Sequence, residues 1–388
     1  MKKAFPGNSP LLLEDRNTTI DVQNPWKGGR ATGMYLKPLR SCVVGCRMGC
    51  VHAMAMATLE DYDLVALCDL REELARRAAV QVGSPKIYTD YATMLAEVRP
   101  DVVTIATPTS THAELTFQAI QAGVKGIYCE KPMATNLADA RRMVKLCREK
   151  GIALAVNHQR RIGAVYYMMH KLLKEGAIGE PYLIRGSCGG DMLSDGTHTV
   201  DSILYLADDC GARWVLGQIY REEPDPSEEK STGFTPSGGW RYGHMIETGA
   251  MAVIELENGW RAEIFTGEMR LPGRGYQDME IFGSEGRIWH PGDRSDPPLL
   301  IWNERPGGWR VVPMDDLPEE YKRYDPITNG YRLFARTVRE GRYHPLSGEN
   351  ALRGLEILMA IYESARLHAR IEPPPHQDRF PLEIMYES

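Results

Sequence analysis

The chain has 388 residues, of which 43% are hydrophobic and 25% charged, and its formal net charge at pH 7 is −6, which is typical of a globular protein with room for two domains. The negative balance argues against nucleic-acid or anionic-membrane partners, and no apolar run reaches the roughly 20 residues of a membrane span. Without a signal-peptide core, we expect a cytoplasmic protein whose eight cysteines are unbridged.

Residues 1–39 mix Gly, Pro, Asn and Lys with isolated apolar residues and show no lasting periodicity, which predicts an extended arm. From there to residue 160, short apolar runs alternate with amphipathic stretches. The predicted strands read CVVG, LVALCD, DVVTIAT, KGIYCE and IALAVN. The predicted helices read GCVHAMAMATL, REELARRAAV, HAELTFQAIQAG and a run after Asn136, which would cap it. This alternation predicts a parallel sheet with helices on both faces.

Distinctive residues fall where the predicted strands end. In a parallel sheet of this kind, ligands bind beyond the carboxyl ends of the strands. We therefore place the candidate chemistry at the residues in these positions, which are Gly45, Asp69, Thr107, Glu130 and Asn157.

The stretch SCVVGCRMGCVH carries Cys42, Cys46 and Cys50 inside a near match to a nucleotide-binding loop. The three thiolates would fall in a strand, a turn and a helix, so they cannot converge on a metal, and their spacing matches no common zinc or iron–sulfur site. We predict no metal. A glycine turn that joins a strand to a helix N-terminus is instead typical of pyrophosphate binding. The predicted contacts are Gly45, Cys46, Arg47, Met48 and Gly49.

Asp69 lies twenty positions after Gly49, at the end of the second predicted strand. A carboxylate there would hold the ribose hydroxyls of NAD and repel the 2′-phosphate of NADP, so NADP is the less favoured cofactor. Arg71, a further predicted cofactor contact, weakens this preference.

Several separated motifs lie between about residue 38 and residue 370. Besides the glycine turn, they are ATPTSTHAE (106–114), the triplet Glu130-Lys131-Pro132, VNHQRR (156–161), GTHTVD (196–201), IFGSEGRI (281–288) and GENALRGLEILMAIYESAR (348–366). Together they resemble the Gfo/Idh/MocA family of NAD(P)-dependent oxidoreductases. The resemblance implies hydride transfer between a carbon that bears a hydroxyl and the nicotinamide ring.

Two positions depart from the family pattern. The usual glycine turn reads GCGRMG, so the central glycine is deleted here, or else Val44 and Cys46 replace the first and central glycines. A side chain at the central position would hinder the approach of backbone to phosphate. The family also often reads D-x-G-x-H, whereas this chain has Ser194-Asp195-Gly196-Thr197-His198, with the aspartate one place late.

Three residues are the predicted catalytic groups. Lys131, at a strand end, could donate a hydrogen bond to the reacting oxygen and stabilise its negative charge. His198 titrates near neutrality and is the candidate general base, or it caps or packs at its helix start. Asp195 could orient that imidazole, or it is the helix N-cap. Asp201, three residues after His198, is the alternative orienting carboxylate.

The resemblance also implies a set of cofactor contacts. Those expected near the nicotinamide and its ribose are Thr107, Pro108, Thr109, His112, Glu130, Lys131 and Asn157. His112 has an alternative role, packing at the start of its helix. The candidate substrate contacts are His158, Gln159, Arg160, Asp195, Trp240, Tyr242 and His244, while Arg161 fits an inter-domain ion pair equally well.

Past residue 161 the pattern changes to period-two strands such as MAVIELENGWRAEIF, in which Asn258-Gly259 predicts a hairpin turn. We predict an arm at 1–39, a Rossmann dinucleotide-binding domain at 40–160, and an α+β substrate and oligomerisation domain at 161–345 with an open, mostly antiparallel sheet. Residues 346–388 are predicted to form a C-terminal helix, ended by the prolines at 373–375, that packs back on the Rossmann domain, and a tail.

The leading interpretation is an NAD-dependent oxidoreductase that acts on a secondary alcohol of a sugar, cyclitol or glycoside. One alternative is a redox-neutral enzyme that cleaves glycosides with the help of bound NAD, and another is a non-catalytic dinucleotide-binding regulator. We expect a carbohydrate-like small molecule as partner, a homo-oligomer (dimer or tetramer), and neither nucleic acid nor membrane.

Overall fold

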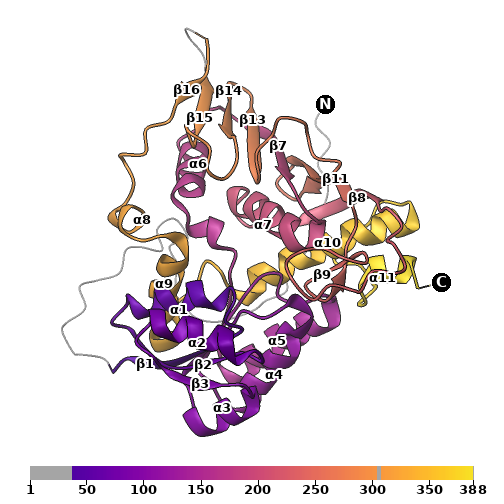
Figure 1. The fold of residues 1–388 in the computed structure, drawn as a ribbon. Coiled ribbons are helices and arrows are strands. Elements are labelled where there is room, and N and C mark those ends of the chain that lie inside the picture. The colour runs from indigo at the N-terminus through magenta and orange to yellow at the C-terminus, as the bar shows by residue number, and fades with distance from the viewer. Residues whose placement is uncertain (1–36, 304–306, 388) are drawn as a thin grey trace, which may run out of the picture. The chain divides into compact units, whose positions relative to one another are not determined.

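A computed structural model describes residues 37–303 and 307–387. Within these residues, six parallel strands form sheet A in the order β3-β2-β1-β4-β5-β6 (Figure 1). The strands are β1 (Leu39–Val44), β2 (Tyr62–Cys68), β3 (Lys86–Tyr88), β4 (Val102–Ile105), β5 (Gly126–Cys129) and β6 (Ala153–Val156). This order confirms the predicted Rossmann sheet. The predicted arm at 1–39 lies almost wholly outside the described residues, and its last residue already begins β1.

Helices link the strands of sheet A. They are α1 (Gly49–Ala57), α2 (Glu72–Gln81), α3 (Tyr91–Val98), α4 (His112–Gln121) and α5 (Leu137–Lys150). Asn136 caps α5 as predicted, because its side chain accepts the N–H of Asp139 at 2.9 Å. The sequence prediction missed β3 and α3, because elements of three and eight residues are too short to establish a clear apolar period.

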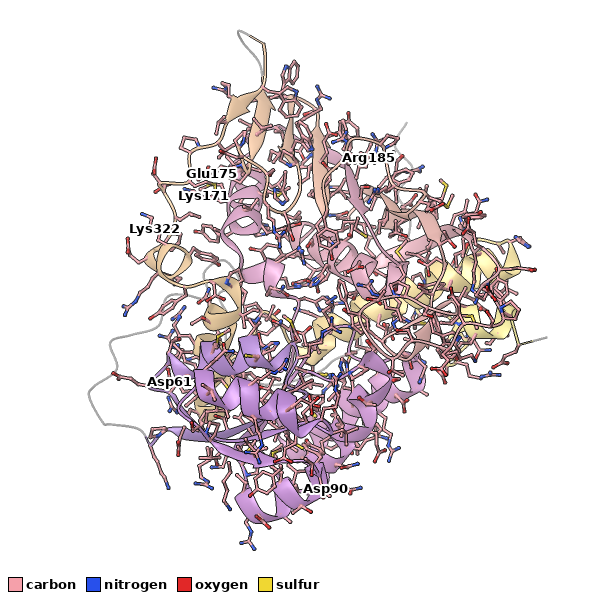
Figure 2. All side chains as sticks on the ribbon, in the orientation of Figure 1. Asp61, Asp90, Lys171, Glu175, Arg185 and Lys322 are labelled. Carbon is pink, nitrogen blue, oxygen red and sulfur yellow. The ribbon has the colours of Figure 1, made fainter. Side chains whose placement is uncertain are left out.

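One face of sheet A is completed by a helix from far along the chain. Helix α9 (Pro326–Glu340) lies beside α1 (Figure 1), and its Tyr331 and Phe334 are fully buried. Gly126 in β5 leaves space for them, since a Cβ there would lie 3.0 Å from the Phe334 ring. Arg339 of α9 also pairs with Asp61, just before β2 (Figure 2). Residues within the range predicted for the second domain therefore pack on the Rossmann sheet.

A buried polar cluster fixes α9 on the sheet. The Tyr331 hydroxyl shares hydrogen bonds with Thr104 Oγ1 at 2.8 Å and with His52 Nδ1 at 2.9 Å. Its ring stacks on Tyr128, with the centroids 4.4 Å apart. The Tyr62 hydroxyl donates to the Tyr331 carbonyl at 2.7 Å. Because each polar group in the cluster has a partner, its burial is tolerated.

Sheet B has eight strands in the described part of the chain, in the order β16-β15-β14-β13-β7-β12-β11-β8. They are β7 (Pro181–Cys188), β8 (Ala212–Tyr220), β11 (Gly249–Leu256), β12 (Arg261–Gly267), β13 (Asp278–Gly283), β14 (Gly286–His290), β15 (Leu300–Asn303) and β16 (Arg310–Val311). Its pairs are antiparallel except β7 with β12. Asn258-Gly259 turns the chain between β11 and β12, with Gly259 at a φ of 89°. The predicted open, mostly antiparallel sheet is confirmed.

The remaining helices and short turns of the described residues lie between or after these strands. They are the turn η1 (Thr109–Thr111), the turn η2 (Gln159–Ile162), α6 (Ala164–Lys174), the π-helical turn η3 (Met192–Gly196), α7 (Thr197–Leu206), α8 (Glu319–Arg323), α10 (Gly348–Leu367) and α11 (Pro381–Met385), with a small hairpin of β9 (Trp240–Arg241) and β10 (His244–Met245). Among the described residues, no helix combines the length and apolar character needed to cross a bilayer.

The long helix α10 contacts elements of both halves. It packs on β8 and α7 and also on α5, and Ser347 at its N-cap bridges to Ala155 in β6. The helix ends at Leu367, where His368 takes a left-handed conformation with a φ of 50°. The prediction that the prolines at 373–375 end this helix is therefore wrong, because the chain has already turned away before them.

Removing the Tyr331 hydroxyl is expected to destabilise the fold. In Tyr331→Phe, His52 and Thr104 lose a buried hydrogen-bond partner, which should lower the free energy of unfolding by about 1–3 kcal/mol. Urea unfolding followed by tryptophan fluorescence measures the change. Tyr182→Phe is the control, because the Tyr182 side chain is 54% exposed. Equal unfolding midpoints for wild type and Tyr331→Phe would contradict the expectation.

Candidate active site

The glycine turn after β1 keeps the shape of a nucleotide-binding turn although it is one residue short. Gly45 has a φ of 86°, and a Cβ on it would lie 2.5 Å from the Ala106 carbonyl oxygen. A Cβ on Gly49 would lie 2.7 Å from Val43 Cγ1. Gly45 therefore makes the tight turn and Gly49 allows the close packing of α1 on β1, which are the roles of the first and third glycines. The geometry agrees with deletion of the central glycine.

Cys46 follows Gly45 but does not project from the turn. Its side chain is 3% exposed, and its thiol lies 3.5 Å from the Cys68 carbonyl oxygen. Arg47 and Met48 are the side chains that reach the surface of the turn, and α1 begins without a side-chain cap. Of the first N–H groups of α1, those of Gly49 and Val51 bond the Gly45 and Met48 carbonyls, at 3.1 and 3.0 Å, so the helix offers a ligand mainly its positive dipole end.

Asp69 lies beside this turn, as the sequence predicted. Its Oδ2 accepts the N–H of Cys46 at 2.7 Å, and its Oδ1 accepts the N–H of Arg71 at 2.9 Å. The carboxylate thus ties the end of β2 to the glycine turn. The Arg71 side chain is exposed.

His112 joins two of the loops at the sheet edge. Its Nδ1 lies 2.9 Å from the Pro132 carbonyl oxygen, and its Nε2 lies 2.9 Å from the Thr107 carbonyl oxygen. Because both ring nitrogens face backbone carbonyls and the residue is 1% exposed, His112 has the packing role that was the alternative to cofactor contact. It holds the loop of Thr107, Pro108 and Thr109 against the loop of Lys131.

The side chains of Glu130 and Asn157 link the ends of β5 and β6 to each other and to helix α1. Glu130 Oε1 accepts from His52 Nε2 and from Asn157 Nδ2, each at 2.7 Å, and its Oε2 accepts the N–H of Lys131 at 3.1 Å. Burial alone would raise the pKa of Glu130, but the hydrogen bond and charge of His52, with the charge of Lys131, hold it at about 2. Both side chains therefore act on the position of Lys131, and sequence reasoning missed His52.

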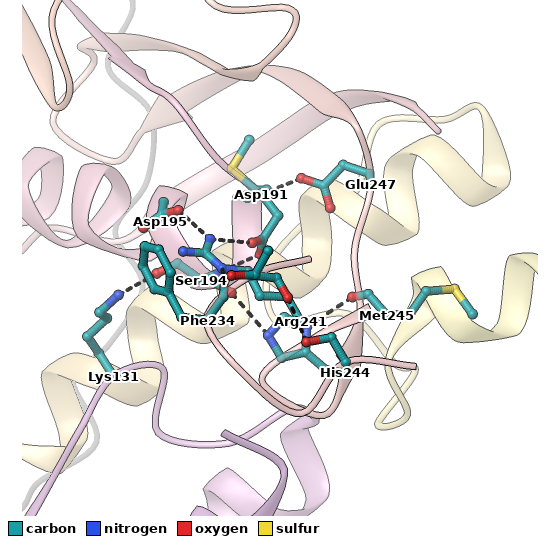
Figure 3. Close-up of polar contacts among 12 residues, drawn as sticks. Lys131, Asp191, Ser194, Asp195, Phe234, Arg241, His244, Met245 and Glu247 are labelled. Atoms are coloured by element: carbon teal, nitrogen blue, oxygen red, sulfur yellow. Dashed lines mark hydrogen bonds and ion pairs between the residues drawn. The ribbon is translucent and has the colours of Figure 1, made fainter. Parts of the chain in front are cut away.

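Lys131 reaches across to the turn before α7. Its Nζ donates to the Ser194 carbonyl at 2.7 Å (Figure 3). The charge of Lys131 lowers the pKa of both Asp195 and His198. Asp195 does not orient His198 as predicted, because its carboxylate bonds Arg241 and Tyr276 instead.

His198 is a buried neutral imidazole in the first turn of α7. It is 4% exposed, and its Nδ1 has no hydrogen-bond partner among the described residues. Burial and then the charges of Arg160, Lys131 and His158 hold its pKa well below the usual value. A neutral imidazole with a free nitrogen is able to accept a proton.

Asp195 lies in the π-helical turn η3, where the N–H of Gly196 bonds the Asp191 carbonyl five residues back, at 3.1 Å. The wider π-helical turn accommodates Asp195, which stands one position later than the aspartate of the family pattern. Its Oδ2 accepts from Arg241 Nη1 at 2.7 Å (Figure 3). Its Oδ1 accepts from the Tyr276 hydroxyl at 2.7 Å. Burial raises its pKa, but Lys131 and Arg241 more than offset this, so the pKa is lowered.

The alternative roles of Asp195 and Asp201 are wrong. Asp195 is not the cap of α7, because Gly196 stands at that position. Asp201 does not orient His198: both its oxygens accept from Arg161 Nε, at 2.9 and 2.8 Å, and it lies 3.7 Å from His158 Nδ1. Arg161 also pairs with Asp209 at 2.6 Å. It therefore forms ion pairs, but with residues of its own predicted domain, 161–345, and not across the predicted boundary.

Two of the predicted substrate contacts are already engaged within the protein. His158 Nε2 lies 3.0 Å from Thr197 Oγ1. His244 uses Nε2 with Ser194 Oγ at 3.1 Å and Nδ1 with the Met245 carbonyl at 2.9 Å. Both are fully buried, so they position the turn of Ser194 and Thr197 rather than offer free donors.

Part of the buried Arg160 guanidinium group has no hydrogen-bond partner among the described residues. Its Nη2 pairs with Asp293 at 2.6 Å, but its Nε and Nη1 are buried without a partner among the described residues. Gln159 Oε1 is likewise buried and unpaired. These free polar atoms keep both residues as candidate substrate contacts.

The segment 221–248 extends from sheet B to the nucleotide-binding loops. Its Tyr242 carbonyl accepts the N–H of Ser110 at 3.3 Å, and its Phe234 ring lies between Arg47 and Arg241, at 5.5 and 5.0 Å. Trp240 stacks under Lys230 at 4.2 Å. Sequence reasoning missed Asp191, Arg241 and Tyr276, and Arg241 lies within WRYGH, between two residues that were predicted.

The described residues contain no cluster of side chains able to hold a metal ion. Cys42 lies in β1, Cys46 in the turn and Cys50 in α1, and all eight cysteines, which fall within the described residues, are free thiols. Burial raises the pKa of Cys42 and of Cys46 to about 12, so both stay protonated.

Comparison with known proteins identifies relatives of this chain. The family model described as an oxidoreductase family with an NAD-binding Rossmann fold (GFO_IDH_MocA) matches residues 39–158. The chain is 30% identical over 361 residues to a D-apiose dehydrogenase of Rhizobium rhizogenes, covering 86% of this chain and 96% of that one. It is 26% identical over 342 residues to a myo-inositol 2-dehydrogenase of Thermotoga maritima, covering 84% and 96%.

A solved oxidoreductase of Agrobacterium radiobacter, in complex with NAD⁺, L-tartaric acid and magnesium, has the same fold. The TM-score is 0.69 at 22% identity, over 86% of this chain and 98% of that chain. With the Rossmann order of sheet A, the shortened but intact glycine turn and Lys131 facing the turn of Asp195 and His198, the protein belongs to the Gfo/Idh/MocA family of oxidoreductases.

Proposed function

We propose that this protein is an NAD-dependent oxidoreductase that transfers a hydride between a secondary alcohol of a sugar, cyclitol or glycoside and the nicotinamide. The observation that carries the proposal is the hydrogen bond from Lys131 Nζ to the Ser194 carbonyl. It holds an ammonium group beside a buried imidazole and a carboxylate, at the sheet edge where dinucleotides bind. Relatives that act on apiose and on inositol support a carbohydrate-like substrate.

The residues of this chain fit a dinucleotide. A Cβ on Gly45 would collide with backbone atoms, and the Cys46 side chain points into the protein. Main-chain atoms alone therefore line that part of the turn. The glycine turn and the positive dipole end of α1 would hold the pyrophosphate, and Asp69 would hold the ribose. When bound, NAD supplies the carbon that accepts or donates the hydride.

The side chains supply the proton chemistry. Lys131 donates a hydrogen bond to the reacting oxygen and stabilises its negative charge. His198, neutral at physiological pH, accepts the hydroxyl proton in the oxidative direction and returns it in reduction. Asp195, kept ionised by Lys131 and Arg241, fixes the electrostatic surroundings of both. The same groups could serve a redox-neutral reaction, which stays a hypothesis, as do the regulator role, the homo-oligomer, the cytoplasmic location and the domain boundaries.

Lys131→Met is expected to abolish most turnover and to spare the cofactor. Loss of the ammonium should lower kcat by about 10²–10⁴-fold, because the charge that stabilises the reacting oxygen is gone. The affinity for NAD, measured by calorimetry, should change by no more than a few-fold. Lys145→Met is the control, since Lys145 is exposed on α5. Unchanged turnover in Lys131→Met would refute the assigned role.

Arg160→Met is expected to move the pH profile. His198 must be neutral to accept a proton, and its lowered pKa places the acid limb of kcat/KM below pH 6.5. Arg160 is the largest charge that lowers this pKa, so its removal should shift the acid limb to higher pH. Arg148→Met, at an exposed position, should leave the limb in place. An acid limb at the same pH in all three proteins would contradict the role of His198.

Asp69→Ala is expected to weaken the affinity for NAD by about tenfold or more relative to the affinity for NADP. Only NAD has both ribose hydroxyls free to bond the Asp69 carboxylate, so only its affinity includes that charged hydrogen bond. Asp69 also holds the N–H groups of Cys46 and Arg71, but the loss of those bonds affects both cofactors alike. Calorimetric affinities for the two dinucleotides isolate the ribose contact, with Asp63→Ala as control. Equal losses would mean that Asp69 does not touch the ribose.

A further inference from the structure

Two consecutive backbone carbonyls of the π-helical turn η3 accept hydrogen bonds from distant side chains. The Ser194 carbonyl accepts from Lys131, which follows β5 of sheet A. The next carbonyl, that of Asp195, accepts from Gln277 Nε2 at 2.9 Å. Gln277 directly precedes β13 of sheet B. The turn that carries Asp195 is therefore held from both sheets, at adjacent peptide units.

The other end of the Gln277 amide reaches helix α7. Its Oε1 accepts from Thr199 Oγ1 at 3.0 Å, and Thr199 is the residue after His198. The Asp195 carbonyl can only accept a hydrogen bond, so the amide nitrogen must face it and the amide oxygen must face Thr199. One side chain thus links the residues on either side of the segment 196–198, which contains His198.

The backbone of Gln277 is left-handed, with a φ of 62°, although the residue is fully buried. A residue other than glycine rarely takes this conformation, because its Cβ crowds the backbone. Contacts of both neighbours hold it there: the Tyr276 carbonyl accepts the N–H of Asp293 at 2.7 Å, and Asp278 Oδ2 accepts from Trp289 Nε1 at 2.6 Å. An unfavourable conformation that is fixed from both sides, next to a reaction site, indicates a functional constraint.

We propose that Gln277 is a positioning residue that fixes the π-helical turn against α7 and so keeps His198 in the buried place from which it accepts a proton. In this role Gln277 acts through Asp195 and Thr199 and needs no contact with cofactor or substrate. The inference rests on the proposed function for the reaction of His198, but not for the place of its imidazole.

The titration of His198 tests the proposal without turnover. NMR follows the histidine signals of the ¹⁵N-labelled protein against pH, and the His198 signal is the one missing in His198→Gln. Burial and the charges of Arg160, Lys131 and His158 lower the pKa of His198. Gln277→Met has a side chain of about the same length without the two hydrogen bonds. The loosened turn then admits water to the imidazole, so the midpoint should rise by about half a pH unit or more.

Two substitutions at Thr199 give a matched pair that decides the question even if Gln277→Met does not fold. Thr199→Val keeps the shape and removes the donor to Gln277, whereas Thr199→Ser keeps the donor. The His198 midpoint should rise in Thr199→Val and stay at the wild-type value in Thr199→Ser. Gln81→Met, at the exposed end of α2, should also leave it in place. Equal midpoints in Thr199→Val and Thr199→Ser, or a wild-type midpoint in Gln277→Met, would overturn the proposal.

Turnover separates this inference from the proposed function. With a sugar that the wild type oxidises, Gln277→Met should lower kcat by about 10–100-fold and leave KM within about threefold, because only the placement of the proton acceptor has changed. If the His198 midpoint shifts as expected but no sugar yields NADH, the oxidation is refuted while the positioning role stands. If Gln277→Met equals an active wild type in both kcat and midpoint, the oxidation stands and the positioning role is refuted.

Discussion

The hydrogen bond from Lys131 Nζ to the Ser194 carbonyl, 2.7 Å long, is the contact on which the arrangement of the site depends. It joins the carboxyl end of β5 in sheet A to the π-helical turn that precedes α7. A charged donor makes a stronger hydrogen bond than a neutral one, so the ammonium group is held in place rather than left to solvent. The same turn presents Asp195, and His198 follows it on α7, so one contact sets the distance between the dinucleotide sheet and the groups that move protons.

The sequence alone was enough to select the candidate groups, because the strand ends and the motifs are local signals. Lys131 contacts the turn that holds Ser194 and Asp195, directly before His198 on α7. The groups that hold them could not be predicted. Arg241 and Tyr276 contact Asp195 from 46 and 81 residues further along the chain, and no periodicity links them to it. His52 stands in the apolar helix GCVHAMAMA, so its bond to Glu130 becomes visible only when β5 lies beside α1.

Both departures from the family pattern are absorbed by the backbone. At the glycine turn, one residue is missing, and the remaining turn directs the Cys46 side chain into the protein while its N–H bonds to Asp69. Before α7, the aspartate comes late, and a π-helical turn adds the extra length. π-helical turns of this kind are frequent at functional sites, since they re-aim a side chain without ending the helix. A motif read letter by letter therefore overstates the loss of function here.

Folding of the nucleotide-binding half is delayed because it depends on helix α9. Sheet A begins at residue 39, yet the face that carries Tyr128 and Thr104 is covered by Tyr331, which the ribosome adds 175 residues after the last strand of that sheet ends at Val156. Contacts between residues so far apart in sequence form slowly, and apolar surface stays exposed meanwhile. The segment that matches the family model, 39–158, therefore lacks the side chains that cover one face of its sheet until synthesis of the chain is nearly finished.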